Sequence, residues 1–302
     1  MAKATGARSK ITYIVESTYG VTPPTTPTFI EIPRTGGVPN LQKESFASAD
    51  IRSDRMIADM RHGFKSASLS LATELRHTEY DPLFESLMFN TWSTNVLKVG
   101  TTAKSFSIES QFLDVTQYGL MTGAIVNSFN ASIAPDGIVT ATFEFVGKDL
   151  AYSGATAATT ETAAGTTEPF DSLTGSINED GSAIAIVTGL EFSVENNIEP
   201  SKVVGSATAA EQIEGGCSVS GTITAYFENA VLLNKFANET SSSADVTLQD
   251  PAGNTLKFDF PNILYTGADL DAGGTGPITI SLPFTALYDV TDDSSLVITR
   301  SA

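Results

Sequence analysis

The chain has 302 residues, enough for two domains, and its 41% hydrophobic and 17% charged residues describe a globular protein. A formal net charge of −18 argues against a protein that grips nucleic acid phosphates, and the sequence has no run of about 18 apolar residues that would predict a transmembrane helix. The single cysteine, Cys217, excludes an intrachain disulfide and fits a reducing compartment.

Residues 1–28 predict an N-terminal arm. Residues 11–15 favour a short strand, and the proline-rich stretch 20–27 then requires an extended, non-helical path. The start of the chain is basic but lacks the apolar stretch of a secretory signal. We expect this arm to be flexible and to become ordered only when it docks on another chain.

Residues 29–150 predict a first β module. Polar and apolar side chains alternate along residues 64–71, which predicts a strand with one buried face. A short helix is expected at residues 82–88, because Asp81 is a suitable cap and Pro82 is favoured in a first helical turn. Further strands are expected at residues 106–108, 123–126 and 139–145.

A charged excursion at residues 48–61 interrupts the first strands of this module. It carries four large apolar residues, Ile51, Met56, Ile57 and Met60. Loops of this length inside a compact β domain are uncommon unless they bind something. We therefore expect a contact loop and not a free surface loop.

Residues 183–302 predict a second module that repeats the order of the first. The matching segments are two strands at residues 190–194 and 218–224, a polar excursion at 199–216, a helix at 231–236, and strands at 246–248, 261–264 and 278–284. Residues 294–300 favour one more edge strand. Residues 151–182 predict an extended linker or an ordered strap over a neighbour, because residues 153–167 are low in complexity. The predicted fold is mainly β: two tandem β-sandwich or split-barrel modules, each with one short α-helix.

Charge divides the two predicted modules. Residues 1–150 hold 13 Lys and Arg against 15 Asp and Glu, whereas residues 151–302 hold 4 against 20. Either the difference only aids solubility, or the two modules offer electrostatically different faces to their neighbours.

No group of residues predicts catalysis, a cofactor or a metal. The only histidines, His62 and His77, lack further ligands nearby in sequence, and Cys217 has no histidine in its module to activate it. Acidic turns at residues 178–182 and 269–273 lack the spacing of a calcium loop. We therefore expect no enzyme activity and no cofactor.

Residues 11–23, together with the order of strand pair, long loop, short helix and closing strands, resemble the tail tube (major tail) proteins of long-tailed bacteriophages. The resemblance extends over nearly the whole chain but rests on no single specific motif. It implies small β modules joined in six-fold or pseudo-six-fold rings, stacked into the hollow tube through which DNA leaves the virion. The chain would be made in the host cytoplasm and would function in the virion tail.

Two modules per chain imply a trimeric ring with pseudo-six-fold symmetry; the alternative is a hexameric ring with one module as outer decoration. The implied partners are further copies of the chain, the tape measure protein, other tail proteins and genomic DNA that passes without specific binding, with no membrane. The candidate assembly residues are Tyr13, Tyr19, Ile51, Arg52, Asp54, Arg55, Met56, Ile57, Met60 and Arg61.

Two other classes of protein are compatible with a mainly β sequence of this length. A carbohydrate-binding or adhesive β-sandwich protein requires exposed aromatic residues along one strand face, and the single tryptophan, Trp92, argues against it. A pilus or surface-layer protein requires a signal peptide or a sorting tail, and the sequence shows neither.

Overall fold

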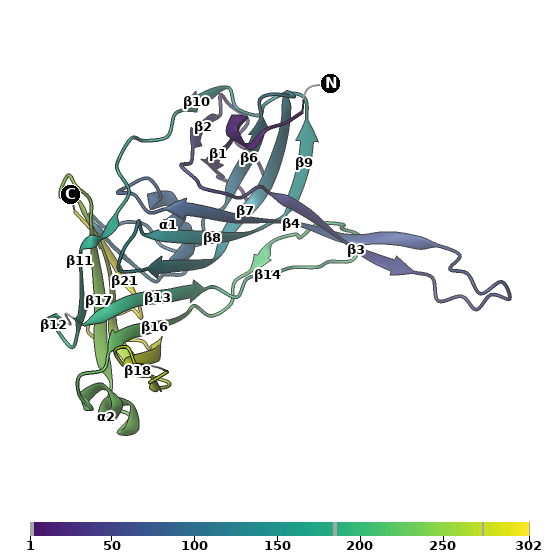
Figure 1. The fold of residues 1–302 in the computed structure, drawn as a ribbon. Helices are drawn as coiled ribbons and strands as arrows, with labels where there is room; N and C mark the ends of the chain where they lie inside the picture. Colours follow the sequence, from purple (N-terminus) through teal and green to yellow (C-terminus); the bar gives the residue numbers. More distant parts are fainter. Residues whose placement is uncertain (1–2, 184–185, 274, 302) are drawn as a thin grey trace.

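The computed structural model describes residues 3–183, 186–273 and 275–301. Residues 1–2 of the predicted arm and residues 184–185, 274 and 302 of the predicted second module lie outside the described residues. The fold is mainly β with two short α-helices, as the sequence predicts (Figure 1). No helix in the described ranges is long and apolar enough to cross a membrane.

The first half of the chain holds helix α1 (Asp81–Leu87), a 3-10 turn (Gly6–Arg8) and strands β1 (Ser9–Val15), β2 (Thr28–Glu31), β3 (Asn40–Ala47), β4 (Met60–Glu74), β5 (Val96–Lys98), β6 (Phe106–Phe112), β7 (Gln117–Ile133), β8 (Thr140–Gly147) and β9 (Asp149–Ser153). The rest holds helix α2 (Val231–Ala237) and strands β10 (Thr160–Thr162), β11 (Asp171–Glu179), β12 (Ser182–Ala183), β13 (Val187–Glu195), β14 (Glu199–Pro200), β15 (Gln212–Ile213), β16 (Ser218–Tyr226), β17 (Ser242–Gln249), β18 (Thr255–Tyr265), β19 (Asp269–Asp271), β20 (Thr279–Ala286) and β21 (Val297–Arg300).

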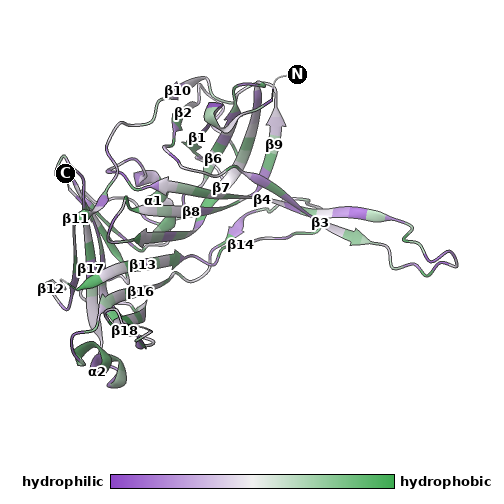
Figure 2. Cartoon of the chain, in the orientation of Figure 1, coloured by the Kyte–Doolittle hydropathy of each residue, from purple (hydrophilic) through white to green (hydrophobic). Residues whose placement is uncertain are grey.

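Alternation of side chains explains the central strands. On β8, and on β4 from Ala67 onward, every second side chain is buried, and Leu69 and Leu71 lie opposite Phe145 and Phe143. Burying each such side chain contributes about 1.5–3 kcal/mol, which fixes the register that turns the apolar face inward. Figure 2 shows hydrophobic and hydrophilic residues side by side along the strands of the body.

Strand β7 belongs to two layers of the first half. Its first part pairs with β6 and β9, and its second part pairs with β8. Gly123 lies between the two parts with φ +63°, and a Cβ there would come within 2.9 Å of side-chain atoms of Tyr19 and Lys148. Only glycine fits this crowded left-handed position, so it allows one strand to serve both layers.

Residues 9–15, expected in a flexible arm, form the internal strand β1. This strand pairs with β6 over seven positions and buries Ile11 and Tyr13. Just beyond it, the buried carboxylate of Glu16 accepts hydrogen bonds from the backbone N–H groups of Gly20 and Gly123 and from the hydroxyls of Ser105 and Ser107. The apolar alternation and these four hydrogen bonds hold the start of the chain in the fold.

The strand pairings of the second half correspond to those of the first. The first-half pairs β3–β4, β4–β8, β7–β8 and β6–β7 match β13–β16, β16–β20, β18–β20 and β17–β18, and all eight are antiparallel. Each half places its helix at the same point, between the second and third of these strands. The two halves therefore share one pairing order.

The two halves meet through a strand pair and a common core. Strand β7 pairs with β13 from Leu190 opposite Ile133 to Glu195 opposite Ser128. The ring of Phe258 lies within about 6 Å of the rings of Phe84, Phe129 and Phe192, which come from both halves (centroid distances 6.0, 6.1 and 5.0 Å). One continuous core therefore spans the joint.

Asn196, which is buried, hydrogen-bonds across the same joint. Its amide donates to the carbonyl oxygens of Leu87, at the end of α1, and Val126, on β7.

The low-complexity segment after β9 is an ordered strap along the first half. Strand β10 pairs in parallel with β2, and the Glu79 carboxylate accepts from the N–H of Gly165 and the hydroxyl of Thr167. Residues 171–179, expected within the linker, form β11 and pair with β17 of the second half. Pairing with a neighbouring strand supplies the order that this composition alone does not predict.

Candidate functional site

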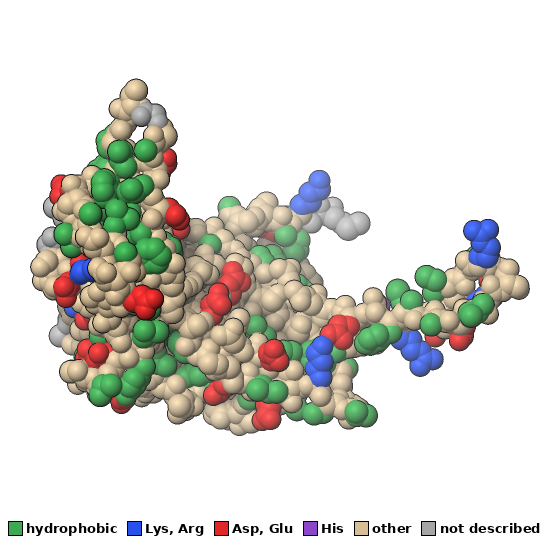
Figure 3. All heavy atoms as spheres, turned by 90° about the horizontal axis from the view of Figure 1, so that it is seen from below, with side chains coloured by type: hydrophobic (Ala, Val, Ile, Leu, Met, Phe, Trp, Pro, Cys, Tyr) green, Lys and Arg blue, Asp and Glu red, His purple; other side chains and the backbone are tan. Residues whose placement is uncertain are grey.

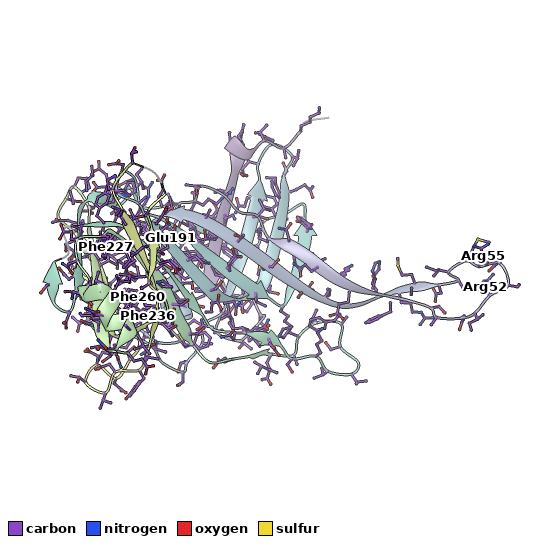
Figure 4. The ribbon with its side chains drawn as sticks, turned by 60° about the horizontal axis from the view of Figure 1, so that its bottom comes forward. Arg52, Arg55, Glu191, Phe227, Phe236 and Phe260 are labelled. Carbon is purple, nitrogen blue, oxygen red and sulfur yellow. The ribbon has the colours of Figure 1, made fainter. Side chains whose placement is uncertain are left out.

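The most exposed feature of the fold is the hairpin of β3 and β4. It leaves the body and ends in the turn at residues 48–59, with Arg52 and Arg55 at its far end (Figures 1 and 4). Every residue of β3 is exposed. The structure brings eight of the candidate assembly residues together on this hairpin: Ile51, Arg52, Asp54, Arg55, Met56, Ile57, Met60 and Arg61.

Apolar side chains on this hairpin have no contact with the body that shields them from water. Ile51, Met56, Ile57 and Met60 are 102%, 66%, 73% and 60% exposed. Such a cluster on a protruding element is typical of an interaction surface. Two of the three arginines are paired locally, Arg52 with Asp54 and Arg61 with Asp59.

The two remaining candidates, Tyr13 and Tyr19, lie in the body. Tyr13 is buried and packs edge-on against Phe106 at 5.6 Å between ring centroids. Tyr19 packs against a small cluster that includes Ile198 of the second half. Burial raises the pKa of both tyrosines to about 12, so both hydroxyls stay protonated at neutral pH.

The excursion of the second half, residues 196–217, is folded against the first half. The N–H of Lys65 donates to the carbonyl of Ala207 at 2.8 Å, Lys202 pairs with Glu44, and Ala209 is only 2% exposed. Ile198 packs against Ile125. This contact lies at the same joint that β7 and β13 form.

Strands β3 and β19 leave open edges at the two ends of the run β3-β4-β8-β7-β13-β16-β20-β19. Among the described residues, β3 pairs only with β4, and β19 pairs only with β20. All three residues of β19 are exposed, as are all of those in β3. Open strand edges are templates for pairing with another chain.

A polar groove of about 550 Å³ lies across the joint, on the face of the sheet away from the core. Its lining is rich in hydroxyl and amide groups, and Ser132 donates to Glu191 across the β7–β13 pair. Glu144 accepts from Ser70 on the same face. The charged residues on this face of β4, β7, β8, β13, β16 and β20 are all acidic: Glu74, Glu144, Glu191 and Glu195.

The described residues show no arrangement for metal or thiol chemistry. Among them, no three His, Cys, Asp or Glu side chains lie close enough to hold a metal ion. Burial raises the pKa of Cys217 to about 11, so the thiol is a poor nucleophile at neutral pH. Figure 3 shows Asp and Glu side chains scattered over the body, with Lys and Arg side chains at the end of the hairpin.

Sequence reasoning missed the edge residues of β3 and β19 and the joint residue Asn196. The sequence does contain a signal for the edge at β19. Residues 139–145 and 278–284 align with each other; the first segment pairs with β7 and the second with β19, so β19 occupies the position of β7 in the second half. No local pattern marks Asn196, whose role depends on two carbonyls that lie 70 and 109 residues away in the chain.

Comparison with known proteins agrees with a protein that assembles through its exposed hairpin and open strand edges. A search among curated proteins finds no match to the chain. The family model described as phage tail tube protein matches residues 6–286, which is nearly the whole chain. This is a family of structural proteins of the virion tail. The chain therefore belongs to the phage tail tube protein family.

Proposed function

We propose that three copies of this chain form a ring of six β modules, and that such rings stack into the tail tube. The observation that carries the proposal is the β7–β13 joint inside one chain. It shows how one half pairs with the other and leaves β3 and β19 open at the outer ends. The matching pairing order of the halves supports two copies of one module.

Strand registers give the expected joint between two chains. Asn130, Ala131 and Ser132 of β7 pair with Thr142, Ala141 and Thr140 of β8, just as β19 pairs with Ser281, Ile280 and Thr279 of β20. Strand β19 therefore occupies the place in the second module that the end of β7 occupies in the first.

Strand β3 corresponds in the same way to β13. Asn40 and Gln42 lie opposite Ser68 and Ser66, as Ser193 and Glu195 lie opposite Ser220 and Ser218. Within the chain Ser193 lies opposite Asn130. Between chains, Asn40 of one copy is then expected opposite Asp269 of the next.

Closure of the ring removes both open edges. A head-to-tail contact that repeats around an axis closes into a ring when its rotation allows, and β3 and β19 then each gain a second neighbour. Three chains with two modules each supply six modules. The competing arrangement is a ring of six chains in which one module per chain lies outside.

The polar, acidic face of the sheet is the proposed lining of the channel. Its charged residues are carboxylates, which repel DNA phosphates, and its hydroxyls offer no base-specific contact. We propose that DNA passes without specific binding and that the chain acts by assembly and not as an enzyme. The proposed partners are further copies of the chain, the tape measure protein and other tail proteins, after synthesis in the host cytoplasm.

Native mass spectrometry of purified rings tests the stoichiometry. We expect the mass of three chains, with electron micrographs that show six-fold features around a central channel. A ring with the mass of six chains would contradict the trimer and favour the arrangement with outer modules.

A disulfide tests the joint itself. In a Cys217→Ser background, Asn40→Cys with Asp269→Cys places two thiols on directly opposite residues, with Cβ atoms about 4.5–5.5 Å apart. Mild oxidation should give covalent circles of three chains on a non-reducing gel. Gln42→Cys with Asp269→Cys is the matched control, displaced by two residues to about 7–8 Å, and should link poorly. Equal linking of both pairs would refute the register.

A further inference from the structure

We infer that the tip of the β3–β4 hairpin docks on the second module of the neighbouring copy, on a surface made by Cys217, Leu264 and residues 287–290. This inference rests on the proposed function, because it requires the β3–β19 joint between two copies. It goes further by naming the partner surface and the side chains that become buried there.

The second excursion is the template for this contact. Residues 43–65, which comprise the end of β3, the turn and the start of β4, correspond in position to residues 196–217 between β13 and β16, and the two segments differ in length by one residue. The second segment lies against the module whose β7 pairs with β13, where Ala207 accepts from Lys65. The first segment extends away from the body (Figure 1). In the proposed ring it would point to the neighbouring module.

Corresponding positions predict which hairpin residues are buried by docking. Ser66 of β4 and Ser218 of β16 are corresponding positions, and Ile57 and Ala209 each lie nine residues before them. Ile57 is therefore the counterpart of Ala209, which is 2% exposed. Ile57 itself is 73% exposed in the free chain. Counting forward from the other strand, Ile51 takes the place of Val204, and these two are 102% and 107% exposed. Docking is therefore expected to bury Ile57 and to leave Ile51 in solvent.

The proposed seat is found by the same correspondence. Lys65 and Ile125 contact the second excursion in the first module, and their counterparts in the second module are Cys217 and Leu264. Val219 pairs with Ala286, so Leu287 comes next to Cys217 in space.

This seat exposes apolar side chains of its own. Leu287, Tyr288 and Val290 are 42%, 59% and 83% exposed. Apolar side chains are thus open to solvent on both proposed partners, and contact between the two would remove them from water.

Charge favours the same orientation. Among the described residues, Arg55 has no ion-pair partner within the chain, whereas Arg52 and Arg61 each have one. Arg55 is the counterpart of Ala207, which contacts Lys65, so docking would place Arg55 beside Cys217, the counterpart of Lys65. Asp289 and Asp293 lie in the loop that borders this surface. An attraction of this kind weakens with added salt.

Two matched substitutions test the docking. Ile57→Asp should raise the chain concentration at half-assembly of rings at least about tenfold, because it places a carboxylate in an apolar contact. Ile51→Asp, the same change six residues earlier, should shift it less than about threefold. Both side chains are exposed in the free chain, so circular dichroism of the unassembled variants should match the wild type.

A cross-link tests the seat directly. Arg55→Cys should form a disulfide with Cys217 of the neighbouring copy when assembled rings are oxidised at about pH 9. Arg55→Cys with Cys217→Ser should not link, and Asp50→Cys with native Cys217 should link at least about tenfold more slowly, because its counterpart Val203 is exposed.

The outcomes separate this inference from the proposed function. Rings that close through Asn40→Cys and Asp269→Cys, but show equal effects of Ile57→Asp and Ile51→Asp or no Arg55→Cys link, overturn the docking and leave the ring intact. Failure of the ring joint itself overturns both. A selective Ile57 effect together with the Cys217 link supports the docking.

Discussion

Replacing Phe258 by alanine removes the aromatic ring that the two halves of the chain share. Phe258 is fully buried and lies 5.0 Å from Phe192, 6.0 Å from Phe84 and 6.1 Å from Phe129, measured between ring centroids. Buried Phe→Ala changes cost about 3–5 kcal/mol, because the lost transfer free energy adds to that of the cavity left behind. We expect about 4 kcal/mol here, since rings from both halves surround the cavity and cannot all collapse into it.

Thermal unfolding of the unassembled chain measures this loss. An unfolding entropy of about 2.1 cal/mol/K per residue gives about 0.6 kcal/mol/K for a chain of this length, so Tm should fall by about 6 °C. Phe236→Ala on α2 is the matched control: Phe236 is 38% exposed, and its truncation should lower Tm by less than about 2 °C. Equal shifts for the two variants would refute the claim that the halves are stabilised by one shared core.

Four further predictions concern the polar groups of Asn196, Glu16 and Cys217. Asn196→Ala should cost about 2–3 kcal/mol in urea unfolding, because two buried carbonyl oxygens lose their donor; a cost below about 1 kcal/mol would contradict this. Glu16→Gln should cost about 2 kcal/mol and reduce hydrogen-exchange protection of β1, because an amide NH₂ would face the groups that now donate to the carboxylate; unchanged protection would count against it. Alkylation of Cys217 in the native chain should rise about tenfold per pH unit from about pH 8 to 10, because burial raises the pKa from 9.0 to about 11, whereas urea-unfolded chain should level off above its ordinary value. The raised pKa also means that this thiol's contribution to stability is complete below about pH 9 and is lost as the pH rises through about 11, which unfolding of Cys217→Ser in parallel checks.

Patterns within a few neighbouring residues predicted the strand β4 and the helix α1. Alternation at Ala67, Leu69 and Leu71 identified both the strand and its buried face. The helix expected at residues 82–88 is present as α1, with bounds shifted by one residue. Pro82 fixes this start, because its ring is favoured in the first turn and carries no N–H to satisfy.

Contacts between distant segments were not predictable in the same way. Residues 171–179 contain Gly175 and little alternation, and they form a strand because β17 supplies their hydrogen bonds. The pairing of β7 with β13 and the ordering of residues 9–15 by β6 likewise depend on registers between segments far apart in sequence. Side-chain period indicates that a strand exists but does not name its partner.

The candidate site was predicted in part. The apolar residues of the excursion at 48–61 marked the hairpin as an exposed surface, and the structure places all of them there. Tyr13 is a candidate from the predicted arm, but its spacing from Ile11 is typical of a buried strand face, and both side chains are buried on β1. The open edges of β3 and β19 follow from the strand pairings of the structure.

The last strand of the chain has a consequence for the timing of folding during synthesis. Strand β21 pairs with β5 of the first half, and Arg300 forms an ion pair with Asp81 and stacks over Trp92. The first half therefore receives one of its strands only after residue 300 has left the ribosome. A nascent chain that has made the hairpin but not β21 is incomplete in both halves. We therefore expect chains that lack β21 to fold less completely in both halves.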